Sequence, residues 1–203
     1  FGGVVTGGSD TGWGTAVAAS TQTLEPGLWS LDTFGEVLIA TISNGRTFTW
    51  NAGATDPTSN RASTTTPSTD GAATGVNSPF ATLIGTNTAG DAVGNPTKSR
   101  LTLVSPTTRH LIHFGTEETI GDATTQDDML IRFSDSEQLN KFTTLATNTA
   151  GSFRLQDGTR IVSALVAKET ILIWTDNALY TMRFIGAPFT FGFEQVGTNC
   201  GLI

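Results

Sequence analysis

The 203-residue sequence contains little cysteine, little charge and no long apolar run. Its single cysteine, Cys200, excludes an internal disulfide and a zinc site built on a cysteine framework. Charged residues make up 14% of the chain, against about 25% in a typical domain, so few positions suit an exposed helix face. No apolar run approaches the roughly 18 residues of a membrane helix. We therefore expect no membrane insertion of this segment.

Basic patches are also missing. The formal net charge is -7, and no run of lysine or arginine occurs in the sequence. Proteins that grip nucleic acid backbones usually carry such a patch, so tight DNA binding is not expected. An acidic wall past which DNA slides remains compatible with this charge.

The residues that fill the chain are threonine, serine, glycine, asparagine and alanine. Threonine is β-branched and favours strands and turns over helices. No segment of useful length has helical periodicity. Composition and periodicity together predict an all-β protein.

The chain divides into a Gly/Thr-rich arm or loop over 1–27 and an incomplete β-region over 28–203, which contains a long irregular loop insertion over 51–99. Within the arm, Trp13 stands between two glycines and is a candidate interface anchor. Within the insertion, one short apolar stretch lies near Pro79–Ile84. The chain begins at Phe1 and ends on apolar residues, so we expect a piece of a larger polypeptide.

Short apolar runs separated by turn residues predict antiparallel hairpins along the β-region. Turns are expected at Gly35-Glu36, Asn44-Gly45, Asp157-Gly158 and Asp176-Asn177. The expected strands are Val37–Ile42, Arg46–Trp50, Leu101–Ser105, His110–Phe114, Met129–Phe133, Leu139–Phe142, Ile161–Val166, Thr170–Thr175 and Ala178–Phe184.

Three of these hairpins share a pattern: an apolar run containing Leu-Ile, a turn with Asn or Asp, and a return strand that ends on an aromatic residue. They span Glu36–Trp50, Asp128–Phe142 and Thr170–Phe184. Repeated short meanders favour β-propeller blades of four strands over the alternative, a sandwich. At about 40–50 residues per blade, this length supplies three to four blades, and a closed ring needs more chain.

Several stretches resemble the tail nozzle proteins of short-tailed bacteriophages, the tail tubular protein B type. They are Trp29–Glu36 with Leu38–Ala40, Gly45-Arg46 and Trp50; Met129–Asp135 with Ala146–Gly151 and Arg154-Leu155; and Ile171–Asp176 with Leu179-Tyr180, Gly186–Phe189 and Phe191–Phe193. The positions that carry the resemblance are Trp29, Asp32, Phe34, Gly35, Glu36, Gly45, Trp50, Asp135, Asn148, Trp174, Asp176 and Tyr180.

The resemblance implies a virion structural protein with propeller domains around a DNA channel. It implies a ring of identical subunits, usually six, which contacts a tail adaptor or connector protein, with tail fibres as further partners. Exiting DNA would touch the ring transiently and without sequence specificity. No catalysis and no cofactor are implied.

Residues that suggest catalysis or metal binding lack suitable partners. His110 and His113 are expected on opposite faces of one strand, so they cannot share a metal. Glu117-Glu118 and Asp127-Asp128 fit no EF-hand spacing and are expected to be solvated loop charges. Cys200 is expected to be a small buried residue, since no signature supports a Cys–His pair with His113. We therefore expect no enzyme.

The aromatic residues are expected to pack within the fold. Tyr180 lies in an alternating strand, and Trp29, Trp50 and Trp174 lie in strand-like contexts where core packing is the default. Two alternative functions remain open at this point. One is a carbohydrate-binding or receptor-binding propeller of the tail, in which tryptophans stack on sugars. The other is an adhesive β-domain, which the lack of a cysteine pair disfavours.

Overall fold

The computed structural model describes residues 27–51, 82–83 and 94–202. This part of the chain contains twelve β-strands, one short 3-10 turn, η2 (Ala123–Thr125), and no α-helix. The prediction of an all-β protein is confirmed. The arm before Gly27, with its Trp13, and most of the loop insertion over 51–99 lie outside the described residues.

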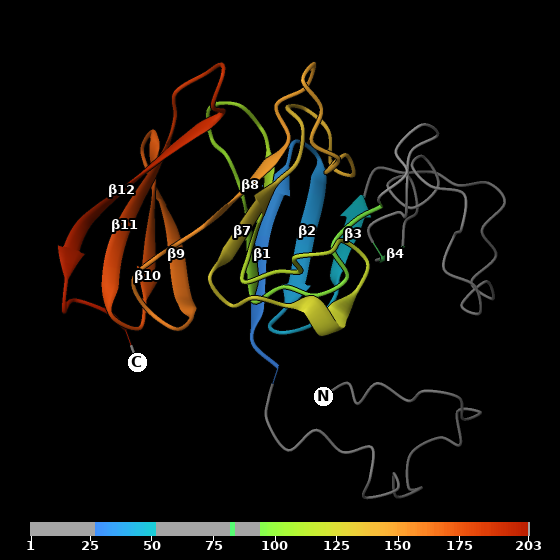
Figure 1. The fold of residues 1–203 in the computed structure, drawn as a ribbon. Helices are drawn as coiled ribbons and strands as arrows, with labels where there is room; N and C mark the ends of the chain where they lie inside the picture. Colours follow the sequence, from blue (N-terminus) through green and yellow to red (C-terminus); the bar gives the residue numbers. More distant parts are fainter. Residues whose placement is uncertain (1–26, 52–81, 84–93, 203) are drawn as a thin grey trace, which may run out of the picture.

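The strands form three antiparallel sheets of four strands, and each sheet takes its strands in chain order (Figure 1). Sheet 1 consists of β1 (Trp29–Phe34), β2 (Val37–Ile42), β3 (Thr47–Asn51) and β4 (Thr82–Leu83). Sheet 2 consists of β5 (Leu101–Val104), β6 (Leu111–Phe114), β7 (Leu130–Phe133) and β8 (Gly151–Arg154). Sheet 3 consists of β9 (Ile161–Ala167), β10 (Thr170–Thr175), β11 (Ala178–Phe184) and β12 (Phe191–Thr198).

A four-stranded meander is the repeating unit of a β-propeller, so each sheet has the architecture of a blade. The three sheets stack, with sheet 2 in the middle (Figure 1). Their first strands lie together, because β5 contacts β1 on one side and β9 on the other. Neighbouring blades of a propeller also meet along their first strands. The predicted antiparallel meanders of propeller type are therefore present.

The two central strands of sheet 2 are buried on both faces. Every residue of β6 and β7 is buried. Successive side chains of a strand point to opposite faces, so Leu111 packs with sheet 1 and Ile112 packs with sheet 3. Both strands are therefore mainly apolar on both faces, and each carries one polar residue, His113 or Arg132, on the face turned to sheet 1.

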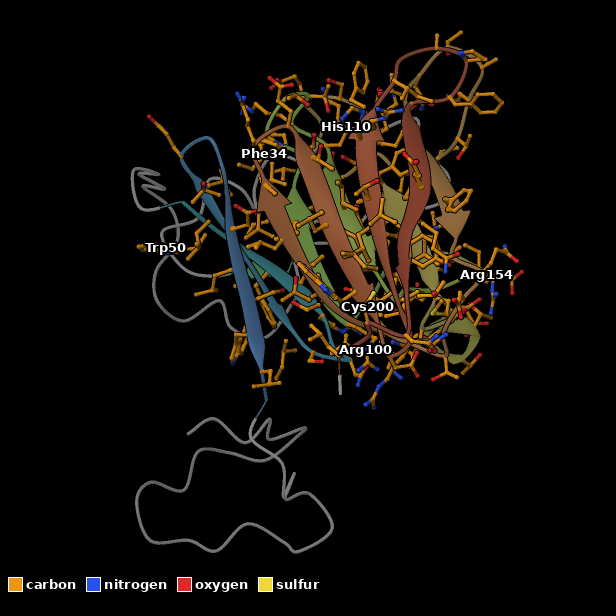
Figure 2. The ribbon with its side chains drawn as sticks, turned by 90° about the vertical axis from the view of Figure 1, so that its left-hand side faces the viewer. Phe34, Trp50, Arg100, His110, Arg154 and Cys200 are labelled. Atoms are coloured by element: carbon orange, nitrogen blue, oxygen red, sulfur yellow. The ribbon has the colours of Figure 1, made fainter. Side chains whose placement is uncertain are left out.

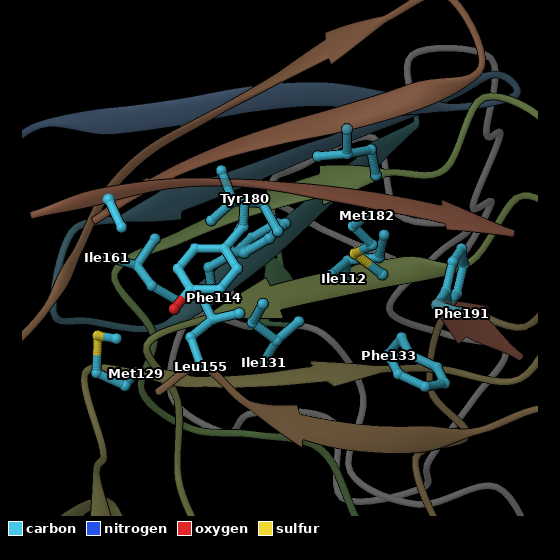
Figure 3. Packing of buried hydrophobic residues seen from close by; sticks show 13 residues of the cluster. Ile112, Phe114, Met129, Ile131, Phe133, Leu155, Ile161, Tyr180, Met182 and Phe191 are labelled. Atoms are coloured by element: carbon cyan, nitrogen blue, oxygen red, sulfur yellow. The ribbon is translucent and has the colours of Figure 1, made fainter. Parts of the chain in front are cut away.

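An apolar interface joins sheet 2 to sheet 3 (Figure 3). Phe133 and Phe191 meet edge to face in it, with ring centroids 4.9 Å apart. At its outer margin Phe153 of β8 stacks on Phe193 of β12 at 4.1 Å. The buried cluster consists of Ile112, Phe114, Met129, Ile131, Phe133, Leu155, Ile161, Ile171, Ile173, Ala178, Tyr180, Met182 and Phe191.

A polar interface joins sheet 1 to sheet 2. Its buried apolar cluster is smaller and consists of Phe34, Val37, Ile39, Val104, Leu111 and Phe142. A row of hydroxyl groups runs beside this cluster. The Oγ1 atom of Thr41 lies 2.8 Å from that of Thr47 within sheet 1 and 2.7 Å from that of Thr102 in sheet 2. Hydrogen bonds therefore supply part of this contact between sheets.

The strongest sequence signals gave correct strand bounds. The predicted strands Val37–Ile42, Thr170–Thr175 and Ala178–Phe184 coincide with β2, β10 and β11. The predicted tight turns also occur, with positive φ at Gly35 (64°) and Asn44 (58°). Glycine and asparagine tolerate this left-handed geometry, which closes hairpins of this kind.

Two predicted elements are wrong. Leu139–Phe142 is not a strand, because β7 pairs with β8 instead. Phe142 is nonetheless fully buried, and its ring packs edge to face on His113 at 5.1 Å. Asp157-Gly158 is not a hairpin turn, since it lies in the crossing from β8 to β9. Phe142 fills space between sheets 1 and 2 without joining a strand. Asp157-Gly158 belongs to the connection that leads from sheet 2 to sheet 3.

The repeat was also misaligned at its middle member. The first and third members contain the second and third strands of their sheets, whereas the middle one begins at β7, the third strand of sheet 2. The last strand, β12, was not predicted. Its sequence intersperses Gly192 and Gly197 with charged and polar residues, and its pairing with β11 shifts register between Leu179 and Tyr180.

Candidate assembly surface

Sheet 1 presents an uncharged apolar face on the side away from sheet 2. None of the described strands packs on this open face of sheet 1. Trp29 is 54% exposed, Leu31 61% and Trp50 39%, and Figure 2 labels Trp50 beside the strands of sheet 1. The face consists of Trp29, Leu31, Thr33, Leu38, Ala40, Ile42, Phe48 and Trp50, and Thr33 is its one polar residue.

The strand register places these side chains opposite one another in cross-strand rows. Leu31, Ala40 and Phe48 are cross-strand partners, as are Leu38 and Trp50. The rings of Trp29 and Phe48 lie 6.0 Å apart. Contiguous exposed apolar area of this kind marks an interaction surface in soluble proteins.

Sheet 3 presents a second apolar surface on its side away from sheet 2. Leu172 pairs with Leu165 across β9, and Trp174 pairs with Leu179 across β11. Leu165 is 57% exposed. These four residues form the apolar part of the open face of sheet 3, and the rest of that face is polar or charged, with Ser163, Thr170, Thr181, Arg183 and Glu194. Within the described residues, exposed apolar side chains thus lie at both ends of the stack.

The tryptophan predictions are therefore wrong. Trp29, Trp50 and Trp174 were expected in the core, but they lie on the two open faces. The sequence did carry a signal. β2 and β10 carry apolar residues at both odd and even positions, as do β6 and β7 apart from His113 and Arg132, and both faces of β6 and β7 are covered. Only one face of β2 and of β10 is covered within the described residues.

Asp32 connects sheet 1 to the free edge of sheet 2. Its Oδ2 atom accepts a hydrogen bond from the backbone amide of Val104 at 2.7 Å, and Ser30 Oγ accepts one from the amide of Thr102 at 3.1 Å. Both amides point away from β6, the strand to which β5 is paired. Two side chains of β1 therefore cap an edge that would otherwise leave its donors unpaired.

The β1–β2 turn contains three more of the positions that carry the resemblance. Phe34 is buried, and the Arg109 guanidinium lies 4.8 Å from its ring centroid. Gly35 takes the positive φ of the turn, and Glu36 completes it. In the following β2–β3 turn the carbonyl of Gly45 accepts a hydrogen bond from the Ser99 amide at 3.2 Å. These residues shape turns that meet sheet 2.

Asp135 and Asn148 organise the connection from β7 to β8. The Asp135 carboxylate accepts hydrogen bonds from Ser136 N and Thr149 N, both at 3.0 Å, and pairs with Lys141 at 3.3 Å. Burial alone would raise the pKa of Asp135, but the hydrogen bonds outweigh it and lower the pKa. Asn148 donates to the Thr143 carbonyl at 2.7 Å. Both residues hold a loop shape.

Asp176 and Tyr180 fix the crossing from sheet 2 to sheet 3. Asp176 accepts hydrogen bonds from the Thr159 hydroxyl and from Thr159 N, which lower its pKa. Tyr180 is buried in the apolar interface, as predicted, and its hydroxyl oxygen accepts from the Asp157 amide at 2.8 Å. These are structural contacts. Trp13, the candidate interface anchor, lies outside the described residues.

The two histidines lie on opposite sides of sheet 2, as predicted. His110 packs against Phe133 and Phe191 in the apolar interface, whereas His113 packs against Phe142 in the polar interface. Among the described residues, no three histidine, cysteine or acidic side chains come close enough to hold a metal ion. In the same residues no helix is long and apolar enough to cross a membrane.

Three predictions about polar residues are corrected. Glu117 is fully buried rather than solvated, because Thr97 and the Gly121 amide donate to its carboxylate. Asp127 and Asp128 are not free loop charges, since Arg154 and Arg100 pair with them at 2.5 and 3.1 Å. Cys200 is exposed rather than buried, so it does not pair with the buried His113.

No family model matches the chain, and no curated protein matches it.

Proposed function

We propose that this chain is a structural component of a bacteriophage tail, a nozzle-type subunit that belongs to a ring around the DNA exit channel. The observation that carries the proposal is the exposed apolar side chains at the two ends of the stack, around Leu31 and around Leu165, which no described strand covers. Sheet 2 shows how such faces are satisfied in this fold, because a four-stranded sheet covers each of its sides. The open faces would be covered in the same way in the assembled particle.

The other features fit a structural role. Several positions that carry the resemblance to nozzle proteins, among them Asp32, Asp135 and Asp176, make edge caps and loop contacts. The net charge of -7 would keep a channel wall from holding DNA by its phosphates. The proposed partners are further copies of the subunit, a tail adaptor or connector, and tail fibres.

The test is incorporation into particles. Six copies around the tail axis are expected in purified virions, and a chain found only as a freely diffusing monomer would overturn the proposal. Leu31→Arg and Leu165→Arg each place a charge on one open face and should abolish incorporation while the chain still folds. Phe189→Arg is the matched control. Phe189 is 70% exposed on the β11–β12 loop, away from both faces, and this variant should incorporate normally.

The exposure of Trp29 and Trp50 on one face favours a second candidate, a carbohydrate-binding or receptor-binding propeller. A glycan array separates the two. Saccharide binding that is lost in Trp50→Ala, with particle assembly intact, would favour receptor binding over the nozzle.

A further inference from the structure

His113 occupies an unusual place at the polar interface. Its side chain is completely buried on the face of sheet 2 that is turned to sheet 1, in the same cross-strand row as Thr102. The Nδ1 atom lies 3.1 Å from Ser99 Oγ. The Nε2 atom has no hydrogen-bond partner among the described residues. A second proton on this ring would therefore be buried without an acceptor.

The charges around His113 also oppose protonation. Arg132 is its cross-strand neighbour on β7, and the guanidinium donates to the carbonyls of Glu117 and Glu118 at 3.2 and 2.8 Å. Burial, and then the positive charge of Arg132, lower the pKa of His113 to about 3. The other charged residues on the segments packed around the ring are Asp32, Lys98, Glu117, Asp135, Glu137 and Lys141, and Glu137 pairs with Arg109 at 3.3 Å.

The carboxylates among these residues are hydrogen-bonded or paired elsewhere and do not contact the His113 ring. Thr97 N donates to Glu117 at 2.9 Å, Lys141 pairs with Asp135 at 3.3 Å, and Asp32 accepts from the Val104 amide. Lys98 would add to the positive charge. A proton on His113 therefore has no carboxylate partner in the closed interface.

His110, in the apolar interface, differs in its contacts. Both ring nitrogens lie near hydroxyl groups, with Nδ1 2.7 Å from Thr108 Oγ1 and Nε2 2.9 Å from Thr149 Oγ1. Burial lowers its pKa to about 4, against a smaller raising effect of Asp135. Its interface also rests on a larger apolar cluster than that of His113. Protonation of a histidine therefore destabilises both interfaces, but the polar interface has less apolar packing to keep it closed.

We propose that acid opens this molecule at the polar interface first, releasing sheet 1 from sheet 2 while sheets 2 and 3 stay packed. Opening exposes His113 to water, where it binds a proton readily. Below pH 6.5 each further pH unit favours the open form about tenfold, which amounts to roughly 30-fold by pH 5. The inference depends on the packing of the sheets and does not require the proposed function.

Hydrogen exchange resolved by residue tests the proposal on the full chain. A small sheet without a packed face is only marginally stable in water, so the hydrogen bonds within sheet 1 should open once it leaves sheet 2. Between pH 7.5 and pH 5, after correction for intrinsic exchange, protection of amides in β2 and β3 should therefore fall about 30-fold, and it should be lost at a higher pH than that of amides in β10 and β11. Equal loss of protection in sheets 1 and 3 at every pH would overturn it. This comparison needs no variant.

His113→Gln supplies an amide that does not titrate and should remove the acid-dependent loss from sheet 1. His110→Gln is the matched control and should leave that loss in place. If His113→Gln folds and sheet 1 still loses about 30-fold protection by pH 5, the assignment to His113 is wrong.

Discussion

The two interfaces of sheet 2 solve the same packing problem with different chemistry. Toward sheet 3, aliphatic and aromatic side chains form one continuous cluster (Figure 3). Toward sheet 1, a smaller cluster is flanked by threonine hydroxyls, a buried histidine and the side chains that cap the edge of β5. Apolar burial is insensitive to direction, whereas each hydrogen bond requires its partner in place.

This difference predicts how each interface responds to change. The apolar interface should lose stability in proportion to the volume removed from it. The polar interface should respond to protons and to single hydroxyl or carboxylate groups, because a buried polar group that loses its partner keeps its full desolvation cost. The four predictions below separate these two kinds of response.

The largest loss of stability is expected when either of two buried phenylalanines is replaced, and these two variants compare the interfaces directly. Phe114 lies in the apolar interface and Phe142 in the polar interface, and both are fully buried. Phe114→Ala should lower the free energy of unfolding by about 4 kcal/mol, and Phe142→Ala by about 3 kcal/mol because fewer apolar neighbours surround it. Urea denaturation measures both, with Phe189→Ala as the exposed control. A larger loss at Phe142 would contradict the contrast between the interfaces.

Acid should cost stability through both histidines. Unfolded histidine has a pKa near 6.5, whereas burial lowers the folded pKa to about 4 for His110 and about 3 for His113. The unfolded chain therefore binds more protons below pH 6.5. Stability is complete above that pH and falls as the pH approaches the folded values, by about 2 kcal/mol for each histidine at pH 5.

The free energy of unfolding at pH 7 and pH 5 measures this loss. Each His→Gln variant should lose about half of the pH dependence, and the double variant nearly all of it. The pKa values of Asp135 and Asp176 are lowered from the ordinary aspartate range, so these groups change stability only below pH 5. A pH dependence that survives in the double variant would show that other groups cause it.

The edge cap made by Asp32 should matter more than its half-buried position suggests. Asp32→Ala leaves the Val104 amide without its acceptor and should cost about 2 kcal/mol, since the lost hydrogen bond has a charged acceptor. Asp122→Ala is the control, because that carboxylate bonds only within its own exposed turn among the described residues. Thermal unfolding compares the two, and equal, small shifts would argue against a role for the cap.

The smallest effect is expected in the hydroxyl row. Thr41→Val keeps the shape of the side chain but removes the oxygen shared by Thr47 and Thr102, at a cost of about 1 kcal/mol. Adding Thr102→Val should cost less than the sum of the single variants, because the second hydroxyl has already lost a partner. Strict additivity would show that the row is not coupled.

The strands were predictable wherever the apolar pattern was strong. Val37–Ile42 and Thr170–Thr175 were correct to the residue because β-branched runs bounded by turns leave few alternatives. β12 was missed because glycines and polar residues interrupt its pattern. Leu139–Phe142 was mistaken for a strand because an apolar pattern of only four residues occurs both in paired strands and in loops whose side chains fill space between sheets.

The assembly surface was less predictable than the fold. A run such as β2 shows that both faces are apolar, but it does not say which face is covered by the described chain. The three tryptophans were therefore placed in the core. Glu117 is buried because Thr97 and Gly121 donate hydrogen bonds to its carboxylate. Thr97 lies 20 residues before it in the chain, and no local sequence pattern predicts that the two residues meet.

The burial of the central strands of sheet 2 on both faces has a consequence for how the chain folds. Pairing within sheets 2 and 3 joins strands that follow one another in the chain, over tight turns between β9, β10 and β11 and over longer loops between β6, β7 and β8. The two faces of sheet 2 need partners that come from opposite sides in sequence, β1–β3 before it and β9–β12 after it. During synthesis, sheet 2 therefore leaves the ribosome with one side ready to dock and the other still bare, until sheet 3 has been made.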